Sequence, residues 1–222
     1  APPGGGEERD DLYDPVTNQF QPVITSSIYR SNASATLLQD GRILLAGGWT
    51  GIEVTATASL YDPRTGAITA VGSMAAPRFR HSAVLLASGE VLVTGGQADA
   101  RCGIGGRMQD TAELYDPVTR TFRPAGSMTT PRVGHSITTL ADGRVMIAGG
   151  STTPLCSGPS VLDSVETYDV ATARFTSAGR LATPRALHAA VRVPDGRVLL
   201  IGGFDSRLSV EFCDGWCGPT SA

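Results

Sequence analysis

The chain has 222 residues, a formal net charge of −3 and only 18% charged residues. With 27 glycines, this composition is typical of a compact, turn-rich β protein rather than of a helical or disordered chain. No basic block and no run of 18 apolar residues occurs, which argues against a nucleic-acid partner and against a membrane span.

The first elements in the chain are a linker and a hairpin. Residues 1–8 (APPGGGEE) combine Pro, Gly and acidic residues, which predicts a flexible linker. Residues 10–23 (DDLYDPVTNQFQPV) predict a β-hairpin, because Tyr-Asp-Pro is followed by a turn and by an aromatic residue seven positions after the Tyr. The Asp carboxylate can accept from the backbone two residues on, and Pro presets the next backbone angle. Matching segments recur at 59–71, 113–125 and 166–178.

A second type of hairpin is clearest at residues 131–150 (PRVGHSITTLADGRVMIAGG). It contains an Arg, a His three residues later, two apolar runs separated by Asp-Gly, and a closing Gly-Gly. Asp-Gly is a preferred two-residue hairpin turn. The same pattern recurs at 77–96 and 184–203, and a less regular copy lies at 29–48. Successive Gly-Gly pairs lie 48, 54 and 53 residues apart. A period of about 50 residues is typical of propeller blades.

The apolar runs of these hairpins are continuous rather than alternating, as in Val198–Ile201. A hairpin covered on one face only would alternate, so both faces are expected to be buried. Four-stranded sheets stacked face to face around an axis meet this demand. Gly-Gly is then expected to turn the chain sharply and to let the neighbouring blade approach.

This combination of apolar hairpin, Gly-Gly, loop, Glu-x-Tyr-Asp-Pro and a later aromatic resembles the kelch repeat over residues 10–213. The resemblance implies an all-β, kelch-type β-propeller over residues 9–222, with ligand-contacting loops after Gly-Gly or between blades. The sequence departs from the kelch pattern where Ala33 replaces the His, where Ser59 replaces the Glu, and where Phe or Ile replaces the usual last-strand Trp. Four blades are recognisable after a leading half-blade at 9–23, at about 30–72, 78–126, 132–179 and 185–214.

The number of blades in the complete ring has two interpretations. The opening half-blade can supply the outer strands of the last blade, which would close a four-bladed ring. However, residues 208–214 (LSVEFCD) also have the pattern of a third strand. The last blade would then have its third strand supplied twice, which favours a chain that is part of a larger propeller.

The repeated charged and histidine positions are predicted to be structural. A repeated position could form a histidine ring for a metal, but we expect each His to anchor the first strand of its blade by a hydrogen bond to a loop backbone. The Arg and Glu groups are expected to form buried ion pairs between blades, because a lone buried charge is very costly. The residues are Arg30, Arg78, Arg132, Arg185, His81, His135, His188, Glu113, Glu166 and Glu211.

The four cysteines fall into two pairs. Cys102 and Cys156 each lie seven residues after the first glycine of a doublet, in corresponding loops of neighbouring blades. Cys213 and Cys217 could close a small loop, and two thiols alone make a poor zinc site. Two disulfides would imply an oxidising compartment, and hence an extracellular or periplasmic location.

These patterns predict a non-catalytic binding scaffold without cofactor or metal. The expected ligand is a protein or a carbohydrate at the loops after Gly-Gly, since binding groups gather on loops held by rigid frames. Candidate contact residues are Trp49, Arg101, Arg107 and Phe204, and the long loops are 97–110 and 151–163. The alternatives implied by the resemblance are a galactose-oxidase-like copper radical enzyme and a sialic acid mutarotase. No residue of this chain carries over to the two-Tyr, two-His copper site of the oxidases.

Overall fold

The computed structural model describes residues 10–23, 30–99, 106–155 and 160–205, which contain sixteen strands and no helix. No helix in this part of the chain is therefore a candidate for crossing a membrane. The strands are β1 (Asp10–Asp14), β2 (Gln19–Val23), β3 (Ser34–Leu37), β4 (Ile43–Ala46), β5 (Ala58–Asp62), β6 (Ala67–Ala70), β7 (Ser82–Leu85), β8 (Val91–Thr94), β9 (Thr111–Asp116), β10 (Thr121–Ser127), β11 (Ser136–Thr139), β12 (Val145–Ala148), β13 (Ser164–Asp169), β14 (Arg174–Arg180), β15 (Ala189–Arg192) and β16 (Val198–Ile201).

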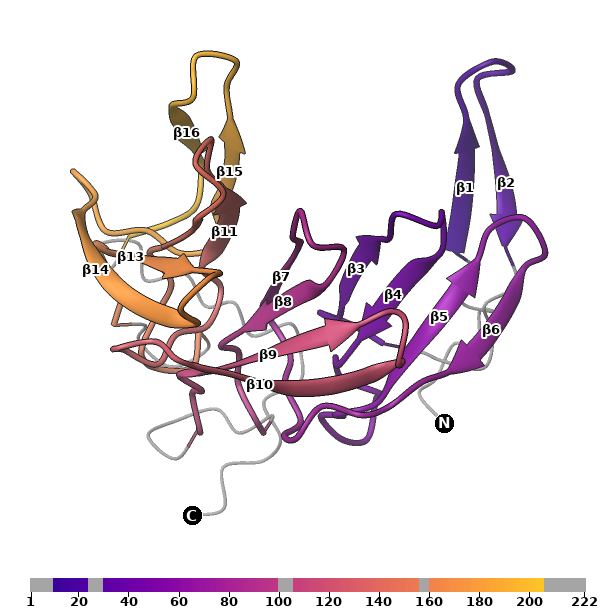
Figure 1. Cartoon of the computed structure of the whole chain (residues 1–222), viewed down its shortest axis with the longest axis horizontal. Helices are drawn as coiled ribbons and strands as arrows, with labels where there is room; N and C mark the ends of the chain where they lie inside the picture. The colour runs from indigo at the N-terminus through magenta and orange to yellow at the C-terminus, as the bar shows by residue number, and fades with distance from the viewer. Residues whose placement is uncertain (1–9, 24–29, 100–105, 156–159, 206–222) are drawn as a thin grey trace.

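Three antiparallel four-stranded sheets form complete blades, β3–β6, β7–β10 and β11–β14. Each blade is a meander in which neighbouring strands in sequence are neighbours in the sheet. The first strands of successive blades, β3, β7, β11 and β15, contact one another, and the blades fan out from them in an arc (Figure 1). The chain therefore has the predicted all-β, kelch-type β-propeller architecture.

Two half-blades lie at the ends of the arc. The hairpins β1–β2 and β15–β16 form separate two-stranded sheets, at opposite ends of the arc in Figure 1. The alternative of a closed four-bladed ring is therefore wrong for this structure, because β1 does not pair with β16. Of the four predicted blades, three are complete, and the fourth has its first two strands among the described residues. Residues 208–214, the predicted third strand, lie outside them.

The inner hairpins turn differently from the two-residue turn expected at Asp-Gly. Leu38 donates its N–H to the carbonyl of Arg42 over 2.8 Å, and Gly41 donates to Leu38 over 3.1 Å. The loop therefore has three residues, and only its glycine has a positive φ, +86°. This is the pattern of a type I turn followed by a left-handed residue. The same bonds recur at 86–90, 140–144 and 193–197.

The core consists of layers between adjacent blades, which explains the continuous apolar runs. All four residues of β8 are buried, as are the four central residues of β9. Leu44 and Leu60 of the first blade pack in one cluster with Val91 and Tyr115 of the second. The expected turns after the Tyr-Asp pairs are also confirmed: Val118 donates its N–H to the Asp116 carboxylate over 2.8 Å.

Candidate functional site

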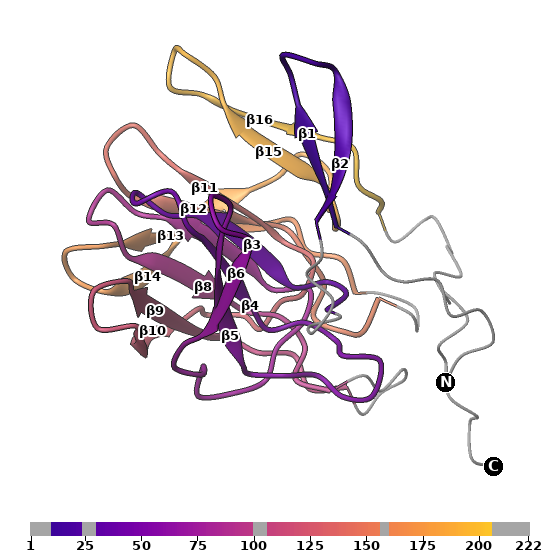
Figure 2. The same cartoon turned by 90° about the vertical axis from the view of Figure 1, so that its right-hand side faces the viewer.

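The strands of each blade run between two faces of the arc (Figure 2). Because consecutive strands are antiparallel, one face carries the β3–β4 type turns and the Asp-Pro turns. The opposite face carries the loops after Gly-Gly and the linkers that lead to the next blade. We call it the Gly-Gly face. It is the face on which the sequence places the candidate ligand loops.

The loops of the Gly-Gly face are held by main-chain bridges at their bases. The residue after each Gly-Gly bridges to the linker that precedes its own blade: Trp49 to Ser31, and Gln97 to Phe79. Gln97 also bridges to Met108, which closes the base of the long loop of the second blade. The third blade repeats this arrangement, with bridges from Ser151 to Val133 and to Val161, and in the fourth Phe204 bridges to Ala186. The loops therefore begin and end on a fixed frame.

A chain of backbone hydrogen bonds links successive blades along this face. Arg80 donates its N–H to the carbonyl of Asn32 over 2.9 Å, Gly134 donates to Arg80 over 3.1 Å, and Leu187 donates to Gly134 over 2.8 Å. All four residues have positive φ, between +52° and +64°, and each lies directly before the repeated His or, in the first blade, before Ala33. We call them the rim residues. Sequence alone does not reveal them, because their side chains share no chemistry and their only signal is this position.

Arg78 and Arg132 each join two blades, but their ion pairs lie within one blade. The Arg78 guanidinium is fully buried and lies 2.8 Å from the Glu113 carboxylate; Arg132 and Glu166 are 2.6 Å apart. Since β9 and β13 belong to the same blades as these arginines, the prediction of ion pairs between blades was wrong. The link between blades is made by the backbone: Gly48 of the first blade donates its N–H to the Arg78 carbonyl over 2.9 Å.

Most polar atoms of these ion pairs have further partners, although Arg78 Nε is buried without one. Arg78 Nη1 also donates to the carbonyls of Gly95 and Thr111, over 2.8 and 3.1 Å. The second carboxylate oxygen of Glu113 accepts from the backbone N–H of Ala75 in the linker over 2.8 Å. Burial lowers the pKa of Arg78, and the Glu113 carboxylate opposes this shift. An Arg stays protonated at any pH at which the protein is folded.

The arginines of the first and fourth blades have fewer partners among the described residues. Arg30 donates to the carbonyls of Gly47 and Thr57 and to the Thr57 hydroxyl, and Ser59 stands at the Glu position. Arg185 donates to the Gly202 carbonyl over 3.2 Å. Glu211, its predicted partner, lies outside the described residues.

The three histidines bind side-chain hydroxyls of the preceding blade, and His81 also has a backbone hydrogen bond to Arg78 in the linker, the kind of loop-backbone partner that was predicted. His81 Nε2 lies 2.8 Å from Ser34 Oγ, and His135 Nε2 lies 2.9 Å from Thr94 Oγ1. His188 repeats the contact with Ser136 over 2.8 Å. Nδ1 of His135 and Nδ1 of His188 are buried without a hydrogen-bond partner.

Burial and the neighbouring arginines lower the histidine pKa values. Desolvation, followed by the charge of Arg78, lowers the pKa of His81 to about 3. Desolvation and Arg132 hold the pKa of His135 well below its usual value of 6.5. Such rings carry no charge at neutral pH, and they are buried between blades. This burial supports the predicted structural role.

Acid is expected to destabilise the fold through these rings. Below pH 6.5 the unfolded chain binds a proton at each His while the folded chain does not, so stability falls as pH falls. The slope is about 1.4 kcal/mol per pH unit for each His that stays neutral. Urea unfolding between about pH 6.5 and 5, above the ordinary carboxylate range, isolates this effect. His135→Gln, whose amide can still donate to Thr94, should reduce the slope by one such contribution; an unchanged slope would contradict the assignment.

The candidate contact residues divide into surface and core. Trp49 is half-buried and Arg107 is exposed, both on the Gly-Gly face. Phe204 is only 7% exposed and packs against Val133, Leu155 and Ala186. It is a core residue, and its predicted role in ligand contact is corrected to packing. Arg101 and the four cysteines lie outside the described residues, so the predicted disulfides and location stay predictions.

Two further side chains on this face were not singled out from the sequence. The Arg80 guanidinium lies over the ring of Phe79, 5.7 Å from its centroid. A cation over an aromatic face is a stable exposed pairing. Arg80 is one of the rim residues, so this pair stands beside the first strands of the blades. The sequence signal is Phe-Arg directly before a repeated His, in a position that varies between repeats.

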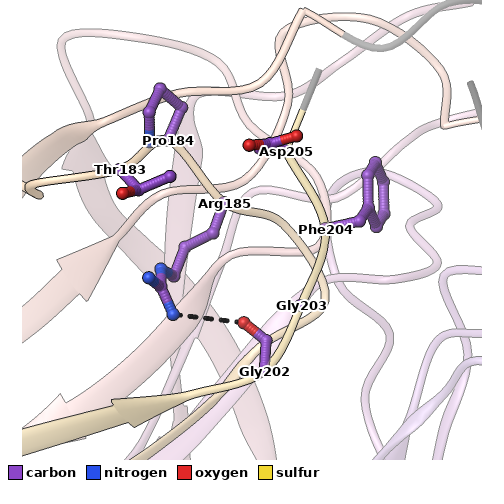
Figure 3. Close-up of a pocket in the computed structure, with 7 residues that line it drawn as sticks. All are labelled: Thr183, Pro184, Arg185, Gly202, Gly203, Phe204 and Asp205. Carbon is purple, nitrogen blue, oxygen red and sulfur yellow. Dashed lines mark hydrogen bonds between the residues drawn. The ribbon is translucent and has the colours of Figure 1, made fainter. Parts of the chain in front are cut away.

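A hollow of about 360 Å³ lies beside β16 (Figure 3). Its lining includes Arg185, whose guanidinium points to the Gly202 carbonyl, and Asp205. In the second and third blades, β9 and β13 occupy the corresponding place beside the second strand. The hollow therefore marks the position of a third strand rather than a small-molecule pocket.

The described residues contain no group of three or more His, Cys, Asp or Glu side chains that could hold a metal ion. The nitrogen atoms that a copper site would need are those of the three histidines. All three rings have lowered pKa values because they are buried beside arginines, and all three hydrogen-bond to a hydroxyl.

Comparison with known proteins supports the architecture. No protein-family model and no curated protein matches the sequence. The solved structure of YjhT is similar, with a TM-score of 0.66 over 78% of this chain at 16% sequence identity. This chain spans 59% of the length of that structure. At this identity the likeness shows a common kelch-type propeller fold.

Proposed function

We propose that this chain is a non-catalytic binding scaffold whose ligand surface is the Gly-Gly face. The single observation that carries the proposal is that the repeated side chains make contacts within the fold, whereas the variable side chains lie at the Gly-Gly face. The repeated His, Arg and Glu side chains are used inside or between the blades. The residues that vary between repeats lie at the Gly-Gly face. They include Trp49, Arg107 and the Phe79–Arg80 pair.

The frame supports this role physically. Main-chain bridges hold the loops of the second and third blades at both ends. Aromatic and Arg side chains are enriched among the residues that dominate binding surfaces. A protein or a carbohydrate ligand fits such a surface. No described residue favours the copper-oxidase or mutarotase alternatives over this one.

Replacing Trp49 by Ala is expected to weaken ligand binding at least about tenfold, the scale of a central contact residue. The probes are a panel of oligosaccharides and extracellular proteins, with affinities measured by isothermal titration calorimetry. A shift in Trp49 fluorescence in a Trp216→Phe background identifies the ligands that reach this face.

Val118→Ala is the matched control, because Val118 is 88% exposed on the opposite face. Its affinity should equal that of the unaltered chain. A ligand whose binding is weakened by Val118→Ala, but not by Trp49→Ala or Arg107→Ala, would place the binding surface on the turn face and overturn the proposal.

A further inference from the structure

The half-blade β15–β16 exposes residues that complete blades bury. Leu199 is 49% and Ile201 55% exposed. Their counterparts Leu44 and Ala46 in β4 are 1% and 0% exposed. In the complete blades, a third strand pairs with this edge. Among the described residues β16 pairs only with β15, and an apolar strand with an unpaired edge is a template for a further strand.

The half-blade β1–β2 lacks the other half of a blade, namely the first and second strands. It carries the Tyr-Asp-Pro turn and the Tyr–Phe ring pair of an outer hairpin, with centroids 5.1 Å apart in Tyr13–Phe20 and 5.0 Å in Tyr115–Phe122. Tyr115 is fully buried, whereas Tyr13 is 47% and Phe20 69% exposed. The hairpin β1–β2 therefore has the sequence of third and fourth strands without an inner hairpin to pack on.

The two half-blades match in register. In complete blades the Tyr of the third strand pairs with the first residue of the second strand, as in Val91↔Tyr115 and Val145↔Tyr168. By the same rule Tyr13 would pair with Val198, Leu12 with Leu199 and Asp11 with Leu200. The Leu12–Leu199 pair reproduces Leu60–Leu44 and Leu114–Leu92. Asp10 would fall opposite Ile201, where complete blades carry Ala or Val, so we expect pairing to end at Asp11.

The charges match as well. Asp11 stands at the position of Glu113 and Glu166, two residues before the Tyr. In complete blades this carboxylate binds the Arg that precedes the first strand. Arg185 is that Arg in the half-blade, and it lines the hollow beside β16 (Figure 3). An exposed carboxylate and a guanidinium are thus placed to meet when β1 lies along β16.

We infer that the β1–β2 hairpin of one copy of this chain completes the β15–β16 half-blade of a second copy. The two hairpins of a single copy lie at opposite ends of the arc (Figure 1), which leaves each available to a neighbouring molecule. The contact is head-to-tail, and such contacts form rings when the rotation closes. Two copies together supply six complete and two composite blades. The resulting eight is within the range of known propellers, about four to eight.

The expected result is a dimer of twice 23.0 kDa in size-exclusion chromatography with light scattering. Leu199→Lys and Leu12→Lys each place a charge in the proposed contact, and each variant alone should elute with the mass of one chain. Both side chains are about half exposed in the single copy, so its thermal unfolding should change little. Val118→Lys, a charge on an exposed turn, should remain dimeric.

Mixing the two variants gives the decisive result. The Leu12→Lys copy still has an intact β16 edge, and the Leu199→Lys copy still has an intact β1–β2 hairpin. A one-to-one mixture should therefore form a dimer through one composite blade, although neither variant dimerises alone. A single-chain mass for the unaltered protein at all concentrations would overturn the inference, and would show that β16 is completed within one copy or stays open. A dimer that survives both Lys substitutions would also overturn it.

Discussion

Replacing Arg132 by Met is expected to lower the free energy of unfolding by about 3–5 kcal/mol, the cost of breaking a buried ion pair from one side. Its guanidinium is fully buried and donates to the Gly149 and Ser164 carbonyls, to the Ser164 hydroxyl and to Glu166. Met fills much of the volume but leaves the Glu166 charge buried and uncompensated. Urea unfolding at pH 7 measures the loss.

Two further variants test the cause of this loss. Arg144→Met removes an Arg of the same blade whose ion pair with Asp142 is half exposed on the surface, and it should leave the unfolding midpoint unchanged. Arg132→Met combined with Glu166→Leu removes both charges, so it should be more stable than Arg132→Met alone. Equal effects of Arg132→Met and Arg144→Met would contradict the structural role assigned to the buried pair.

Replacing Gly95 by Ala is expected to cost about 3 kcal/mol, from left-handed backbone strain of about 1–2 kcal/mol and overpacking of about 1–3 kcal/mol. Gly95 has a φ of +62°, and an added Cβ would lie 2.5 Å from the Arg132 carbonyl oxygen and 2.7 Å from His135 Cε1. Both atoms belong to the linker and first strand of the next blade. The variant should therefore loosen the contact between the second and third blades.

Gly143→Ala is the matched control for this prediction. Gly143 has a φ of +86°, but an added Cβ would meet nothing within 4 Å. The expected cost is the backbone strain alone, about 1 kcal/mol. Thermal and urea unfolding compare the two variants under the same conditions. Equal losses would mean that the close approach of the next blade contributes nothing at Gly95.

The sequence predicted the blades because their signals are local. Tyr-Asp-Pro, Asp-Gly and Gly-Gly each set backbone angles within a few residues, and the period orders them along the chain. Ring closure depends instead on the angle between adjacent sheets, which no motif encodes. For this reason the closed four-bladed alternative could be corrected only by the structure.

The contact partners of the repeated Arg and His side chains could not be predicted from the sequence. Glu113 lies 35 positions after Arg78, a spacing that fits pairing within a blade as well as between blades. The same holds for His135, whose partner Thr94 lies in the preceding blade. Phe204 follows a Gly-Gly as a surface residue would, but Leu155 of the neighbouring blade covers it. These contacts arise from packing across blades.

The hydrogen bonds through Asn32, Arg80, Gly134 and Leu187 have a consequence for how this molecule can change. Backbone N–H and carbonyl groups link adjacent blades there, and every residue except proline has both groups. The side chains at these points differ as widely as an amide, a guanidinium, a hydrogen and an isobutyl group. Because these hydrogen bonds use only backbone atoms, a new side chain that tolerates the positive φ of these positions alters the surface and leaves the link between blades in place.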